Sequence, residues 1–211
     1  MRLYLSSRSV GLARDELTRM LGPGSHVGVI LNALDFLRGT AALAARKEAL
    51  GGFADLGWRT SAVDLSRADT LNGLDGVWAV GGSCFLLARA LADARATASM
   101  VARVRDGSLV YGGSSAGACV AGKNLRPLAL GEDPRIVSQT YRRPVCWRGL
   151  GLLDEVIVPH HQENPGPREI DTPAILAAAA TSGLRATALA DGDNLVLDGR
   201  ARGLWRQGRC V

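Results

Sequence analysis

The sequence contains little lysine, few aromatic residues, few cysteines and no long uninterrupted hydrophobic run. Aromatic residues make up 5% of the 211 positions and charged residues 21%, in a chain that is 47% hydrophobic. A chain of this length and composition can bury a core without disulfides or structural metals. The composition therefore excludes a disordered chain and a disulfide-bonded miniprotein.

The basic residues are nearly all arginine, because Lys47 and Lys123 are the only lysines among 25 basic side chains. With 20 acidic residues the formal charge is +5, yet no run of five or more like charges occurs. A nucleic-acid interface requires clustered positive charge. We therefore predict a solvated basic surface and no nucleic-acid partner.

Several targeting and redox patterns are also missing. The longest uncharged stretch, residues 107–122, is too short and too rich in glycine to span a bilayer. The N-terminal segment MRLYLSSRSV lacks the apolar core and cleavage site of a signal peptide. Cys84, Cys119, Cys146 and Cys210 match neither a CxxC motif nor a zinc pattern. We expect a cytoplasmic protein with reduced thiols and no membrane partner.

Short apolar runs alternate with longer helix-patterned stretches, which indicates βαβ units around a largely parallel sheet. The expected strands are 2–5, 26–31, 59–63, 76–80, 108–111, 155–158 and 186–189. A closing β-hairpin is expected from 194–197 and 203–205. The expected helices are 40–56, 84–94, 97–105 and 173–182. No repeat or linker divides the chain, so we predict one α/β domain over residues 1–211. The least regular segment, 125–150, is of a length that tends to be functional.

A glycine-rich turn follows the strand expected at residues 108–111. Gly113-Ser-Ser-Ala-Gly117 is a G-x-S-x-G motif between a strand and small, helix-compatible residues. Such a turn projects a serine hydroxyl from the sheet, and the amides of the next helix face a developing oxyanion. Ser115 has glycines at the required offsets, and Ser114 is the rival hydroxyl. A tight connection without chemistry is the structural alternative.

A nucleophilic serine needs a base, and the chain contains three histidines. His160 follows an apolar run at an expected strand end, where open α/β sheets place their active residues. His26 begins an early strand, which fits a structural role. His161 is not excluded by composition.

The carboxylate that orients the histidine should also lie at a strand end. Asp191 fits because it follows the run 186–190, and Asp193 is its competitor; the alternative is that both shape a turn. The resulting order of serine, histidine and acid differs from that of an α/β-hydrolase. Asp154 or Glu155 would restore the hydrolase order, but neither lies at the carboxyl end of a strand.

A second glycine turn, Gly81-Gly82, lies between the strand expected at 76–80 and the helix expected at 84–94. The backbone N–H groups of Gly82 and Ala116 are the candidate oxyanion hole. A plain tight turn is the alternative.

Four segments occur in an order and spacing that point to one family: VGGSCF at 80–85, GGSSAGA at 112–118, GLGLL at 149–153 leading to VPH at 158–160, and LADG at 189–192. They resemble the peptidase E (aspartyl dipeptidase) serine peptidases, relatives of the cyanophycinases. The resemblance implies a three-layer αβα sandwich with a mostly parallel sheet, similar to class I glutamine amidotransferases. It places the family nucleophile on Ser115, the histidine on His160 and the acid on Asp191.

The resemblance also implies an activity. It suggests a serine-type exopeptidase that hydrolyses short peptides, such as dipeptides, through an acyl-enzyme and without metal or cofactor. Members that cleave aspartyl dipeptides usually carry asparagine before the proline–histidine pair and an aromatic residue after it, where this chain has Val158 and His161. Arg168 and His161 are the candidate substrate contacts, and preference for an acidic N-terminal residue stays open.

Two other functions use the same residues. One is a non-catalytic binding or regulatory module that holds a small anion at the two glycine turns. The other is an amidase or esterase with a non-peptide substrate. A long distance between the Ser115 hydroxyl and His160 would favour the binding module. The sequence leaves the oligomeric state open, with a homodimer as one option.

Overall fold

A computed structural model describes residues 1–162, 166 and 170–211 of the chain. Its strands are β1 (Arg2–Ser6), β2 (His26–Ile30), β3 (Arg59–Ala62), β4 (Gly76–Ala79), β5 (Val110–Ser114), β6 (Val156–Val158), β7 (Ala186–Ala188), β8 (Asn194–Asp198), β9 (Ala201–Arg206) and β10 (Arg209–Cys210). Its α-helices are α1 (Arg14–Met20), α2 (Gly39–Gly51), α3 (Cys84–Asp93), α4 (Thr97–Asp106), α5 (Ala116–Cys119), α6 (Ile136–Tyr141) and α7 (Thr172–Thr181). Short 3-10 helices cover Asn32–Leu34, Ala54–Leu56 and Arg126–Leu130.

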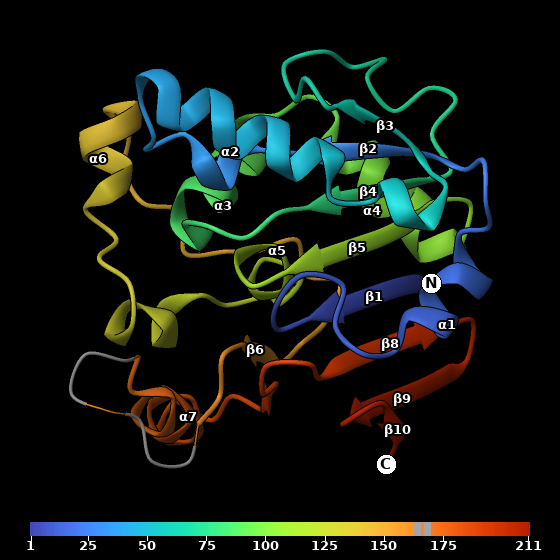
Figure 1. Cartoon of the computed structure of the whole chain (residues 1–211). Coiled ribbons are helices and arrows are strands. Elements are labelled where there is room, and N and C mark those ends of the chain that lie inside the picture. The colour runs from blue at the N-terminus through green and yellow to red at the C-terminus, as the bar shows by residue number, and fades with distance from the viewer. Residues whose placement is uncertain (163–165, 167–169) are drawn as a thin grey trace.

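Most of these strands form one mixed sheet in the order β10-β9-β8-β1-β5-β4-β2-β3 (Figure 1). Neighbouring strands in the stretch β1-β5-β4-β2-β3 are parallel. Strands β8, β9 and β10 are antiparallel to their neighbours. Strands β6 and β7 pair with each other in parallel and form a separate small sheet. This small sheet and α7 lie beside the end of the main sheet at which α5 begins (Figure 1).

The helices cover both faces of the main sheet. The chain moves outward along the sheet from β1 to β2 and β3 through α1 and α2, and it returns from β4 to β5 through α3 and α4. Right-handed crossovers in opposite directions place the two pairs of helices on opposite faces. Figure 1 shows α2 in front of the sheet and α4 behind it. The result is the expected three-layer αβα arrangement.

The core is centred on the middle strands. Every residue of β4 and β5 is buried, as expected for parallel strands covered on both faces. Trp78 of β4 is 1% exposed and contacts the rings of Tyr4 and Phe53. A Cβ atom at Gly112 would lie 2.2 Å from Trp78 Cε3, so glycine at this position of β5 leaves room for the indole.

Each strand expected from the sequence is present, including the C-terminal hairpin, and the α/β sandwich is confirmed. The strand expected at 108–111 is shifted, because β5 covers Val110–Ser114, and β10 was not expected. The helix expected at 40–56 is shorter: α2 ends at Gly51, where two consecutive glycines favour termination, and a 3-10 turn follows. Helices α1 and α6 were not expected from the pattern, and α6 lies in the irregular segment 125–150. Among the described residues, no helix combines the length and apolar character needed to cross a membrane.

Candidate active site

The serine turn joins β5 to α5 in a strained conformation. Ser115 has φ 51° and ψ −112°, outside the regions that L-residues commonly adopt. Its N–H donates to the carbonyl of Ser6 at 3.1 Å, and its carbonyl accepts the N–H groups of Ala118 and Cys119 at 2.9 Å. These bonds hold a conformation that costs about 1–3 kcal/mol in isolation.

Both glycines of the G-x-S-x-G motif are required by close approach. A Cβ atom at Gly117 would lie 2.0 Å from the carbonyl oxygen of Ala79 in β4. One at Gly113 would lie 2.6 Å from the carbonyl of Gly117. The hydroxyl of Tyr111 also donates to that carbonyl at 2.8 Å. The motif therefore reflects how tightly α5 packs on β4 and β5.

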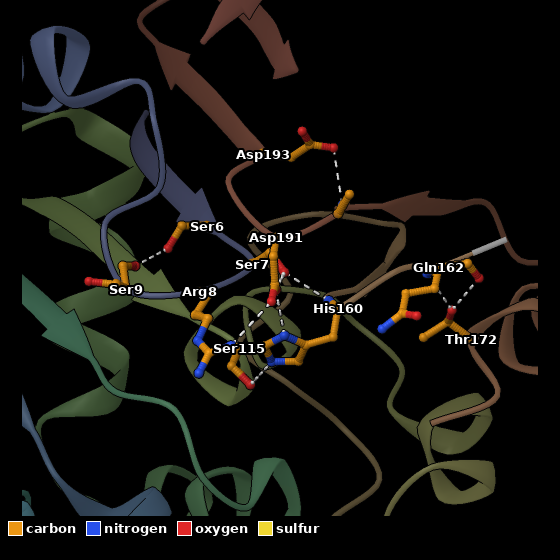
Figure 2. A network of polar contacts seen from close by, with 11 residues as sticks. Ser6, Ser7, Arg8, Ser9, Ser115, His160, Gln162, Thr172, Asp191 and Asp193 are labelled. Atoms are coloured by element: carbon orange, nitrogen blue, oxygen red, sulfur yellow. Dashed lines mark hydrogen bonds and ion pairs between the residues drawn. The ribbon is translucent and has the colours of Figure 1, made fainter. Parts of the chain in front are cut away.

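The structure brings Ser115, His160 and Asp191 together (Figure 2). His160 follows β6 and Asp191 follows β7, so the parallel pairing of these strands places both side chains at one edge of the small sheet. His160 Nε2 lies 2.9 Å from Ser115 Oγ, and its Nδ1 lies 2.8 Å from Asp191 Oδ1. This is the geometry of a base that can accept the serine proton while a carboxylate orients the ring.

Asp191 and Asp193 occupy different environments. Asp193 is buried, and its Oδ2 accepts the N–H of Ala190 at 3.0 Å, which fixes the turn after β7. The carboxylate at His160 is that of Asp191. Burial alone would raise the pKa of Asp191, but the hydrogen bonds from His160, Ser7 and Arg8 and the charge of His160 outweigh it, so this pKa is lowered.

The other carboxylates considered in the sequence lie away from the histidine. Asp154 is exposed and faces Lys123 at 3.7 Å. Glu155 is buried, accepts a hydrogen bond from Thr187 at 2.5 Å and pairs with Arg202 of β9 at 2.5 Å. Glu155 therefore ties the small sheet to the hairpin.

The other histidines and the rival serine also lie elsewhere. His26 of β2 contacts the hydroxyl of Ser61 at 2.8 Å. His161 Nδ1 faces Thr172 Oγ1 at 3.1 Å, at the start of α7, so the structure does not bring His161 to the serine. Ser114 is the buried last residue of β5. Arg168, the remaining candidate substrate contact, lies outside the described residues.

Ser7 is a site residue that the sequence pattern did not predict. It follows β1, is fully buried, and donates from Oγ to Asp191 Oδ1 at 2.9 Å. Ser7 Oγ also accepts the backbone N–H of His160 at 2.8 Å (Figure 2). This bond helps to hold the backbone of His160 at its positive φ of 57°. One hydroxyl thus fixes both the carboxylate and the backbone of the base. The available signal was its place at the carboxyl end of a strand next to β5.

Replacing Ser7 with alanine should lower kcat about 10- to 100-fold with little change in KM, because a hydrogen bond to a charged group is worth about 1.5–3 kcal/mol. The orphaned N–H of His160 should also lower stability by about 1–3 kcal/mol. Steady-state kinetics and thermal melting measure the two effects. Ser6→Ala is the matched control, since its hydroxyl binds the Ser9 carbonyl and no member of the site. Equal kcat values in the two variants would contradict this role.

The second glycine turn lies beside the serine. Gly82 has φ 135°, and a Cβ atom there would lie 2.4 Å from the carbonyl oxygen of Ala33. Gly82 and Ala116 line the same cavity as Ser115 and His160. Among the described residues, no carbonyl or side chain accepts the N–H of Gly82 or Ala116. Both amides therefore remain available to a bound oxygen.

Two cavities adjoin the serine turn. The one that contains Ser115 and His160 has a volume of about 80 Å³. The other, of about 310 Å³, is bordered by Gly81 and Ser114 and has aromatic walls from Phe53 and Trp78. Within the described part of the chain, no three histidine, cysteine, aspartate or glutamate residues are grouped to hold a metal ion.

Comparisons with known proteins give a family and a fold. The model of peptidase family S51 matches residues 46–202. A provisionally assigned peptidase E protein from Listeria monocytogenes EGD-e has a similar structure, with a TM-score of 0.75, 20% identity, and coverage of 97% of this chain and 98% of that chain. A peptidase from an acI-B1 Actinobacterium has a TM-score of 0.63 and 15% identity over 100% of this chain and 96% of that one. None of the curated proteins matches the sequence.

Proposed function

This chain belongs to peptidase family S51, and from that membership we propose that it is a serine exopeptidase of the dipeptidase type with Ser115, His160 and Asp191 as its catalytic triad. The observation that carries the proposal is the hydrogen-bond chain from Ser115 Oγ through both ring nitrogens of His160 to Asp191. The distance of 2.9 Å between serine and histidine favours an enzyme over a binding module.

In the acylation step, Ser115 Oγ attacks the carbonyl carbon of the scissile peptide bond while its proton moves to His160 Nε2. The N–H groups of Gly82 and Ala116 stabilise the negative carbonyl oxygen of the tetrahedral intermediate. Asp191 stabilises the imidazolium through Nδ1–H. The C–N bond then breaks, the amine leaves with the proton from His160, and an acyl-enzyme ester remains.

Deacylation repeats these roles with water. His160 takes a proton from the water as its oxygen attacks the ester carbonyl, and the same two amides hold the second oxyanion. Collapse breaks the bond to Ser115 Oγ, which regains its proton from His160. Each cycle consumes one water, releases a carboxylic acid and an amine, and restores the enzyme.

Hydrolysis of a library of dipeptides and tripeptides by the purified protein, followed by mass spectrometry, tests this function. We expect release of the N-terminal amino acid from dipeptides, and no products from a Ser115→Ala protein prepared in the same way. If the peptides stay uncleaved but simple amides or esters are hydrolysed, the protein is a non-peptide amidase or esterase and not a peptidase. If peptides, amides and esters all stay intact, the result favours the binding module.

A further inference from the structure

The cavity beside Ser115 combines apolar walls with one fixed carboxylate. Its walls include Leu128, Val158, Ile170 and Ile175, from the irregular segment, β6 and the start of α7. Its volume of about 80 Å³ is several times the roughly 10–15 Å³ that one water needs by this measure, so it admits an organic group. The carboxylate in the described lining is that of Glu132.

Glu132 is held rigidly and retains acceptor capacity. Its Oε1 accepts the hydroxyl of Ser83, and its Oε2 accepts the N–H of Cys84 at 3.0 Å, at the start of α3. A carboxylate has about four acceptor positions, so these two bonds leave others for a ligand. The side chain is half-buried rather than free in solvent. Gly131 lets this segment lie close to α7, since a Cβ atom there would be 2.6 Å from Ile170, just before the helix, and 3.1 Å from Ile175 within it.

Glu132 contributes to the cap of α3, because its Oε2 accepts the N–H of Cys84, the first residue of that helix. The hydroxyl of Ser83 caps the same helix by accepting the N–H of Leu86. Glu132 in addition lines the cavity that also contains the Ser115 nucleophile and the amide of Gly82. A negative charge in a partly apolar cavity favours a cationic ligand, because the low local dielectric strengthens the attraction.

We propose that Glu132 binds the α-ammonium group of the substrate and that the apolar walls take the side chain of its N-terminal residue. The inference rests on the proposed peptidase function. In a dipeptide the α-nitrogen is two bonds from the carbonyl carbon that Ser115 attacks, so one small cavity must hold both groups. The substrate class is therefore a short peptide with a free amino terminus and an apolar first residue. A first residue with a carboxylate side chain is repelled by Glu132.

The test compares wild type, Glu132→Gln and the control Asp133→Asn. Asp133 is the neighbouring exposed carboxylate and pairs locally with Arg135. The substrates are Leu-Ala, N-acetyl-Leu-Ala, Lys-Ala and Asp-Ala, which share their second residue. Labelling of Ser115 by a fluorophosphonate probe gives a reading of the nucleophile that does not depend on the substrate amine.

We expect wild type and Asp133→Asn to cleave Leu-Ala at least about tenfold faster than N-acetyl-Leu-Ala or Asp-Ala. Glu132→Gln should lower kcat/KM for Leu-Ala about 10- to 100-fold without slowing probe labelling, since it removes a charge-assisted hydrogen bond to substrate.

Three results would overturn the subsite. One is an unchanged kcat/KM for Leu-Ala in Glu132→Gln, and another is an equal decrease in cleavage and labelling, which would indicate a damaged site. The third is a Glu132-dependent preference for Lys-Ala with Leu-Ala unaffected, which would assign the carboxylate to a side-chain cation. If wild type reacts with the probe but cleaves none of the peptides, the proposed function fails, and the subsite fails with it.

Discussion

Replacing Ser115 with alanine is expected to lower peptide hydrolysis about 10⁶-fold while the protein stays folded. Removal of the nucleophile of a serine protease triad has a cost of this order in kcat, because no other group forms the acyl-enzyme. Stability should change little, since the bonds that hold the turn use the Ser115 backbone, and the bond of its side chain is to His160. Alanine also tolerates the positive φ no worse than serine.

The measurement is kcat/KM for a dipeptide, with thermal melting of the same preparations. Ser114→Ala is the matched control, because it removes the adjacent hydroxyl, which is buried at the end of β5. We expect Ser114→Ala to keep activity within about tenfold of wild type. If Ser115→Ala retains activity in a preparation free of contaminating peptidases, or if Ser114→Ala is the inactive variant, the nucleophile is wrongly assigned.

Local pattern was sufficient to predict the strands and three of the groups that meet at the site. Ser115, His160 and Asp191 each follow a short apolar run, and the carboxyl ends of parallel strands carry the functional residues of α/β folds. The glycines at 113 and 117 gave an additional signal, because a Cβ atom at either would collide with neighbouring backbone. These features depend on neighbours in the sequence and are therefore visible in it.

The features that pattern did not predict depend on contacts between distant segments. Ser7 and Asp191 are 184 positions apart, and nothing near Ser7 in the sequence indicates its two hydrogen bonds. The runs that became β6 and β7 look like the other strands, yet they pair only with each other in the described structure. Glu132 lies in the segment 125–150, where the sequence shows no regular pattern from which a position could be predicted. Its place beside Ser115 is set by packing of this segment against α3 and α7.

The second large effect is expected from Asp191→Asn, which should lower kcat by about 10⁴. An asparagine of the same shape can donate its amide N–H to Nδ1 of His160, which puts the imidazole proton on Nε2 and leaves no acceptor for the serine hydroxyl. The substitution also removes the charge that stabilises the imidazolium. Because the pKa of Asp191 is lowered, its carboxylate is charged in the wild type throughout the range from about pH 5 to 8, and the deficit should persist across it.

Asp193→Asn is the matched control. It tests the carboxylate that supports the turn after β7, whereas Asp191→Asn tests the carboxylate that orients His160. Asparagine at 193 can still accept the N–H of Ala190, so we expect activity within about tenfold of wild type and a loss of stability of about 1 kcal/mol. Profiles of kcat against pH, measured beside thermal melting for both variants, distinguish the two carboxylates. A larger loss of kcat in Asp193→Asn than in Asp191→Asn would transfer the role of acid to Asp193. Similar small losses in both would mean that His160 works without a carboxylate partner, although Asp191 Oδ1 lies 2.8 Å from its Nδ1.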